Sequence, residues 1–148
     1  MGTEHTYCTF QLCDLYLGIN VMQVQEVLRA QGRTRVPLAS DVIQGLINLR
    51  GQIVMAIDLR RRLGLPARGE EESPMNVIVH TEDGPVSFLV DAIGDVIEID
   101  DNAMEPAPIT MDGQTRALLQ GVCKLPRHLM LVLDPERVAA LDHHPSSP

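Results

Sequence analysis

Apolar and polar residues alternate along much of the chain with a period of two, the pattern of strands that bury one face. The alternation is clearest in three segments, residues 8–12, 15–19 and 86–90. Shorter apolar runs predict strands buried on both faces, at residues 53–57, 76–79 and 129–133. Residues 20–30 fit a helical stripe as well as a strand, and we expect a tight turn followed by a strand. Closely spaced turn residues favour small all-β barrels or sandwiches.

Two short helices are expected, each following an aspartate. One begins after Asp58 and ends near Gly64, and the other begins after Asp134 with Pro135 at its first position. The two aspartates could form a paired-carboxylate site, but helix caps that accept backbone N–H groups explain them more simply. The remaining polar stretches, residues 67–74 and 100–112, are expected to be connectors.

An internal repeat relates two parts of the chain. Residues 44–58 (QGLINLRGQIVMAID) align without a gap to residues 120–134 (QGVCKLPRHLMLVLD). A weaker internal similarity, whose alignment needs a gap, links residues 17–19 and 24–27 to residues 88–90 and 93–96. The repeat predicts one domain over residues 5–142, built from two similar five-stranded β-barrels that pack together with a groove between them. The tail at 143–148 is expected to be disordered.

Composition narrows the function classes. The 148 residues include two Tyr, two Phe and no Trp, so the core is expected to be aliphatic. Twelve basic residues against twenty acidic ones give a net charge of −8, which argues against a nucleic-acid partner. No apolar run approaches the roughly 18 residues of a membrane span, and no signal peptide is visible. Three cysteines without CxxC spacing fit a reducing compartment. We therefore expect a cytoplasmic protein without direct membrane insertion.

The sequence contains few features of a catalytic or metal site. It has no GxGxxG, GxxxxGK[ST], HExxH or GxSxG motif. His80 is interpreted as a surface residue at a strand end, and Cys8 and Cys123 as core residues. Cys13 is expected at a hairpin without a histidine to activate it. No cofactor, metal or catalytic residue is predicted. A small acidic β-barrel hydrolase is a remote alternative, and it would need converging polar groups in a pocket.

Four segments carry a resemblance to a known family. They are FQLCDLYLGINVMQVQEV (10–27), VPLASDVIQGLINLRGQIVMAIDLRRRLGL (36–65), VSFLVDAIGDVIEI (86–99), and QGV (120–122) with residues 129–134. In this order and spacing they resemble the CheW family of bacterial chemotaxis adaptors. Two departures stand out: Cys13 occupies a place where glycine is common, and Met55 one where proline is common.

The resemblance implies an all-β fold of two five-stranded SH3-like barrels with short helices, and no catalysis. It further implies an adaptor at membrane-associated receptor arrays with two protein partners. These are the helical tip of a chemoreceptor (a methyl-accepting chemotaxis protein) and the regulatory domain of the histidine kinase CheA. A coupling protein of a non-flagellar chemosensory pathway is the alternative within the same class.

The resemblance also implies site residues. Val24, Gly45, Asn48 and Arg50 match positions near the receptor-binding groove, and Glu26 with Arg50 matches an ion pair beside it. An exposed pair of this kind adds little stability, so we expect Arg50 to matter for signalling more than for folding. Val27 and Val36 are the expected kinase-facing residues, as exposed apolar side chains near residues 29–35.

Overall fold

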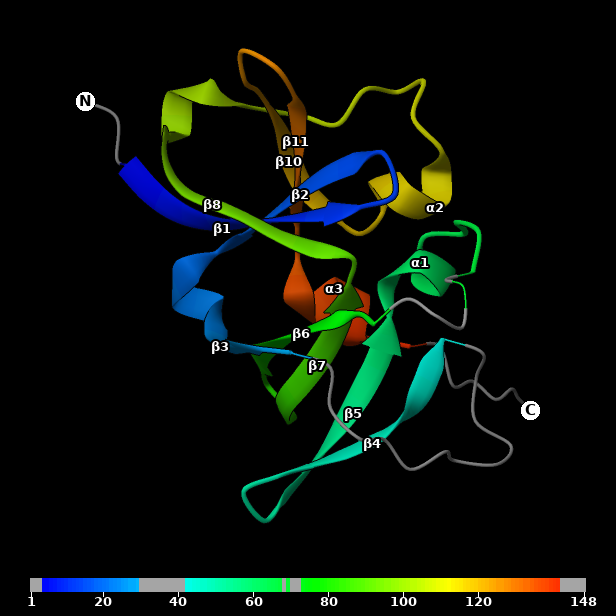
Figure 1. Cartoon of the computed structure of the whole chain (residues 1–148). Helices are drawn as coiled ribbons and strands as arrows, with labels where there is room; N and C mark the ends of the chain where they lie inside the picture. The colour runs from blue at the N-terminus through cyan, green and yellow to red at the C-terminus, as the bar shows by residue number, and fades with distance from the viewer. Residues whose placement is uncertain (1–3, 30–41, 68, 70–72, 142–148) are drawn as a thin grey trace.

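The computed structural model describes residues 4–29, 42–67, 69 and 73–141. The expected disordered tail at 143–148 and the kinase-facing candidate Val36 lie outside these residues. Within the described part the chain is mostly β-structure, arranged in two sheets with short helices between them (Figure 1). The prediction of an all-β fold in two halves is therefore confirmed.

The first sheet has six strands in the order β8-β1-β2-β11-β10-β9. Their bounds are β1 Glu4–Leu12, β2 Leu15–Asn20, β8 Ala92–Asp100, β9 Met104–Glu105, β10 Leu119–Lys124 and β11 Leu129–Leu133. The sheet has one strand more than expected, because the short β9 inside the connector at 100–112 pairs with β10. Strands from both ends of the chain meet in it through the parallel pairing of β2 with β11.

The second sheet has five strands in the order β3-β6-β7-β5-β4. Their bounds are β3 Val24–Leu28, β4 Ile43–Leu49, β5 Gln52–Asp58, β6 Met75–Thr81 and β7 Gly84–Val90. The chain enters this sheet through the 3-10 helix η1 (Val21–Gln23) and leaves it at Asp91, between β7 and β8. The turn followed by a strand that was expected at residues 20–30 is confirmed by η1 and β3.

The two hairpins that the repeat aligns have the same local geometry. In the β4–β5 hairpin a bulge at Gln44 precedes the pairing of Gly45 with Ala56. In the β10–β11 hairpin a bulge at Gln120 precedes the pairing of Gly121 with Val132. Each hairpin ends in an aspartate whose N–H donates to a carbonyl just before the first strand, of Val42 for Asp58 and of Leu118 for Asp134. The gapless alignment of residues 44–58 with residues 120–134 therefore corresponds to the same strand pairing in the two hairpins.

In the weaker internal similarity, the alignment of residues 17–19 with residues 88–90 is wrong by two residues. Gly18 lies beside Val132 and Ser87 beside Ala56, so residues 17–19 correspond to residues 86–88 rather than to 88–90. A shift of two residues leaves every side chain on the same face of a strand, so an alternating pattern cannot distinguish the two alignments.

Both aspartates cap helices, as predicted. Asp58 accepts the N–H of Arg60 at the start of α1 (Leu59–Arg62), and Asp134 accepts the N–H of Glu136 at the start of α3 (Pro135–Ala139). Two further pieces were not predicted: α2 (Gly113–Arg116) and the 3-10 helix η2 (Asp101–Ala103). Both are single turns without an apolar repeat that could reveal them. No helix in the described ranges is long and apolar enough to cross a membrane.

One apolar cluster is shared by the two sheets. It joins Phe10 and Leu17 of the six-stranded sheet to Val79 and Phe88 of the five-stranded sheet. Leu59 of α1 and Val138 of α3 belong to the same cluster, and Figure 1 shows α3 between the two groups of strands. Because the two sheets share buried surface, their relative position is part of the fold.

Candidate protein-docking surface

The apolar inner face of the six-stranded sheet continues uncovered onto its edge strand β8. Directly opposed residues in an antiparallel sheet share a face. Leu17, Phe10 and Ile93 form one such row across β2, β1 and β8, and the first two are fully buried. Ile93, at the end of the row, is 41% exposed. The row therefore leads from the core to the surface.

A second row repeats this arrangement. Ile19 is fully buried, Cys8 beside it is half-buried, and Val96 on β8 is 62% exposed. The bulge in the β1–β8 ladder accounts for the three-residue spacing of Ile93 and Val96 on one face. An edge strand that exposes two β-branched side chains on the core face offers an apolar surface to a partner.

The helix η1, which directly follows β2, adds two more exposed apolar side chains. Met22 is 82% exposed and Val21 is 36% exposed. Strand β1 pairs with β8 and also contacts η1, so both elements lie next to it. We call the four exposed residues Val21, Met22, Ile93 and Val96 the β8–η1 strip. It occupies the junction where the chain passes from one sheet to the other.

Val24, a groove candidate, directly follows η1. It opens β3, pairs with Val79, and packs half-buried against the shared core. Val27 is also half-buried against this core and pairs with Val77. The exposure expected of Val27 as a kinase-facing residue is therefore only partial, because β3 turns it toward the interior.

Glu26 and Arg50 form an ion pair between β3 and the tip of the β4–β5 hairpin. The hydrogen bond from Arg50 lowers the pKa of Glu26 below its ordinary value, with a smaller contribution from Gln25. Arg50 and Gly51 both have positive φ, at 51° and 89°, as in a type I′ turn. This turn fits the tight hairpin but is unusual for arginine. The backbone thus projects Arg50 toward β3.

Asn48 supports the same turn, because its side-chain oxygen accepts the N–H of Gly51 at 2.9 Å. Gly45 lies three residues earlier, buried beside the bulge, with φ at 153°. The structure thus brings together three of the candidates, Glu26, Asn48 and Arg50. Val24 lies at the start of β3, and Gly45 lies within β4. Among the described residues, no hydrogen bond or ion pair connects either of them to Glu26 or Arg50.

A second ion pair, which was not predicted from the sequence, connects α1 to the residue that precedes β8. Arg60 of α1 contacts both carboxylate oxygens of Asp91, from Nε at 2.9 Å and from a terminal nitrogen at 2.7 Å. The two side chains are only 11% and 19% exposed. The position of Asp91 directly after a buried strand was the available signal, since a partly buried carboxylate requires a partner.

The described residues do not form a recognisable catalytic or metal site. No group of three or more His, Cys, Asp or Glu in the described ranges could hold a metal ion. An apolar hollow of about 400 Å³ lies between α1 and α2, but its one carboxylate, Asp112, caps α2. Burial raises the pKa of Cys8 and of Cys123, which favours their unreactive thiol forms. His80 is exposed at the end of β6, as expected.

Comparison with known proteins assigns the family. The model of the CheW-like domain matches residues 6–142. The chain belongs to the CheW family. A chemotaxis protein CheW of Bacillus subtilis is 33% identical over 82% of this chain and 78% of its own length. One from Treponema pallidum is 29% identical over 85% and 76%.

A solved structure extends the comparison to the fold. The scaffolding protein TtCheW from Thermoanaerobacter tengcongensis superposes with a TM-score of 0.85 at 28% identity, covering 96% of this chain and 97% of that chain. The SH3-like fold implied by the sequence resemblance is thereby confirmed. As a member of the CheW family, the chain is a non-enzymatic scaffold of chemotaxis signalling. The hydrolase alternative is not supported.

Proposed function

We propose that this protein couples the helical tips of chemoreceptors to the histidine kinase CheA at cytoplasmic receptor arrays. The observation that carries the proposal is the β8–η1 strip, found in a chain of the CheW family. An adaptor must hold two proteins at once, and this chain has exposed apolar and charged features on both halves of its fold.

The strip fits the recognition of a helix by an apolar groove. An amphipathic helix buries side chains at positions i, i+3, i+4 and i+7 in such a surface. Met22 lies in η1 and Val96 in β8, two elements that both contact β1, and half-buried Val24 directly follows η1. These residues supply apolar contacts from both halves of the molecule. A receptor helix lying along the strip would cover them together.

Charged and turn residues at the hairpin tip form the polar border of this surface. We place Arg50, held by Glu26, and Asn48 beside the receptor helix, with Gly45 shaping the strand behind them. Arg50 then either fixes the wall of the groove or contacts a receptor carboxylate directly. Val27, together with Val36, remains our proposal for the contact with the CheA regulatory domain.

Reconstitution tests the proposal. The purified protein is mixed with CheA and a receptor cytoplasmic fragment from the same organism, and kinase activity is measured as autophosphorylation. Adding the protein is expected to change the autophosphorylation of CheA only when the receptor fragment is also present. A Val24→Arg variant should abolish this change, because a charged side chain at the border of the strip opposes an apolar helix.

The matched control is Ile109→Arg. Ile109 is 86% exposed between β9 and α2, outside the strip and the β4–β5 hairpin, so the same substitution there should leave coupling intact. Thermal unfolding of both variants is recorded, since Val24 also contacts the core. Kinase activity that does not respond to the unmodified protein would contradict the proposed function.

A further inference from the structure

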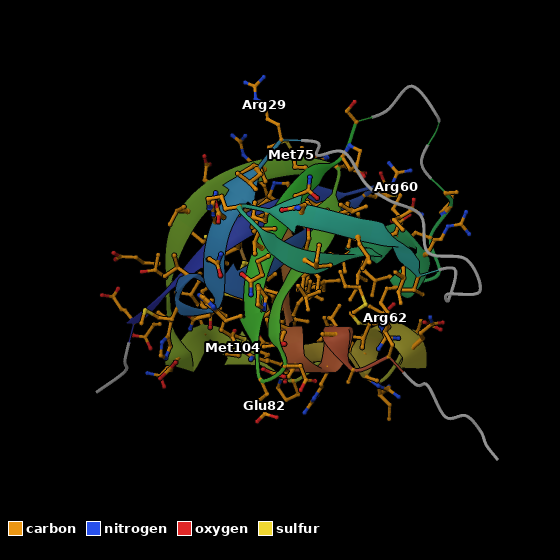
Figure 2. The ribbon with its side chains drawn as sticks, turned by 90° about the horizontal axis from the view of Figure 1, so that it is seen from below. Arg29, Arg60, Arg62, Met75, Glu82 and Met104 are labelled. Atoms are coloured by element: carbon orange, nitrogen blue, oxygen red, sulfur yellow. The ribbon has the colours of Figure 1, made fainter. Side chains whose placement is uncertain are left out.

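The helix α1 carries three consecutive arginines, and two of them bond to segments outside the five-stranded sheet. The helix follows β5 and so belongs to the five-stranded half. Arg60 contacts Asp91 at the point where the chain enters the six-stranded sheet. Arg62 donates to the carbonyls of Val138 and Arg137 at 3.0 Å and 3.1 Å, in the helix that follows β11. Figure 2 shows Arg60 and Arg62 on the same side of the molecule.

Asp91 is fastened to the six-stranded half by its other contacts. Its carboxylate accepts the N–H of Cys13, in the β1–β2 turn, at 2.7 Å. Its own N–H donates to the carbonyl of Gln11 at 3.0 Å. Asp91 thus connects α1 of one half to the β1–β2 hairpin of the other. A bidentate pair between arginine and carboxylate fixes orientation as well as distance, because two parallel hydrogen bonds prevent rotation.

This connection lies directly next to the β8–η1 strip. Asp91 immediately precedes β8, and Ile93 of the strip follows two residues later. Val24, at the border of the strip, belongs to the five-stranded sheet. The placement of Ile93 relative to Val24 therefore depends on how the start of β8 is held against the five-stranded half.

We propose that Arg60 is a positioning residue for partner docking, which acts through Asp91 to set the angle between the two sheets and so the shape of the strip. The effect on docking rests on the proposed function, whereas the effect on the angle does not. A buried ion pair is weak evidence for stability, but in some proteins such pairs specify one arrangement among several of similar energy.

Arg61 supplies a matched control on the same helix. It lies between the two bridging arginines, is 42% exposed, and its described ion pair is with Asp58 of its own half. Arg60→Gln and Arg61→Gln each remove one positive charge from α1, but only the first removes the contact with Asp91. A difference between these variants therefore cannot come from net charge.

Two measurements on these variants test the proposal. Residual dipolar couplings of backbone amides, fitted separately for the two sheets, give the orientation of one sheet relative to the other. We expect Arg60→Gln to change this orientation and to weaken binding of a receptor cytoplasmic fragment about tenfold, a typical size of coupling between distinct sites. Arg61→Gln is expected to match the unmodified protein in both measurements.

The proposal is overturned if the two sheets keep their orientation in Arg60→Gln, or if both variants bind the receptor fragment equally well. Should Arg60→Gln fail to fold, Arg60→Lys takes its place, because lysine keeps the charge but cannot form the bidentate pair. If Arg60→Lys then has the same sheet orientation and the same affinity for the receptor fragment as the unmodified protein, the proposal is overturned. If the unmodified protein does not bind the fragment, the proposed function fails, and the dipolar couplings still decide the role of Arg60.

Discussion

The guanidinium of Arg50 pairs with the carboxylate of Glu26 across the open side of the five-stranded sheet. Their strands are its two edges: β3, which carries Glu26, stands at one end of the strand order, and β4, which leads to Arg50, at the other. The pair therefore links two edges that no backbone ladder joins in the described residues. It is an exposed link, since the Arg50 side chain is 66% accessible to solvent.

The exposure of Arg50 separates its effect on function from its effect on stability. We expect Arg50→Ala to unfold at nearly the same temperature as the unmodified protein, because solvent screens exposed pairs. Kinase coupling in the reconstituted system should nevertheless be strongly reduced. Thermal unfolding followed by circular dichroism, together with CheA autophosphorylation, checks both parts. A large decrease in Tm, or normal coupling, would contradict the assigned role.

The same pair makes a prediction about pH. Arg50 lowers the pKa of Glu26 in the folded protein, so the pair contributes to stability at neutral pH. This contribution is lost as the pH falls through the lowered pKa, where the carboxylate takes up a proton. A titration of side-chain carboxyls by ¹³C NMR should find a lower pKa for Glu26 in the unmodified protein than in Arg50→Ala. Equal values in the two proteins would show that the pair does not persist in solution.

Local features of the fold could be predicted from the sequence. Asp58 and Asp134 were identified as caps because an aspartate before a short helix has a clear local function. The hairpin repeat was identified because both copies keep the same register. What was missed depends on contacts between distant residues. The pairing of β2 with β11 and the ion pair of Arg60 with Asp91 leave no local pattern, and β9 is too short to show one.

The candidate site could be predicted only in part. The resemblance indicated Glu26 and Arg50, which the structure places in contact. It did not indicate Met22 or Val96, because alternation shows which residues share a face but not where that face becomes uncovered. That depends on β8 being an edge strand, which is a property of the whole sheet.

Cys13 has an unfavourable backbone conformation that a glycine would relieve. It is the first residue of the two-residue β1–β2 turn and has φ at 54°. A left-handed conformation costs a residue with a Cβ about 1–2 kcal/mol. We expect Cys13→Gly to raise the free energy of unfolding by about 1 kcal/mol in urea titrations, because the hydrogen bond from its N–H to Asp91 is retained. Cys13→Ala is the control and should not stabilise. Equal effects of the two substitutions would implicate the thiol instead.

Gly121 is required for a different reason, the close approach of β9. A Cβ at this position would lie 2.7 Å from the carbonyl oxygen of Glu105, a contact too short for any side chain. Gly121→Ala should therefore displace β9 and destabilise the fold by about 1–3 kcal/mol. Gly113→Ala is the matched control, because a Cβ there meets nothing within 4 Å. Its free energy of unfolding should change by less than about 0.5 kcal/mol. If both variants lose similar free energy of unfolding, the loss comes from the reduced backbone flexibility of alanine and not from a clash of its Cβ with Glu105.

Met22 allows the most direct test of the β8–η1 strip, since it is its most exposed member and is not part of the core. We expect Met22→Glu to keep the Tm of the unmodified protein and to bind a receptor cytoplasmic fragment about tenfold more weakly, because docking would bury an unpaired carboxylate. Isothermal titration calorimetry measures the affinity. The control is Ile109→Glu, which introduces the same charge at a side chain 86% exposed outside the strip. If both variants lose affinity equally, charge repulsion explains the loss, and the receptor does not dock on the strip.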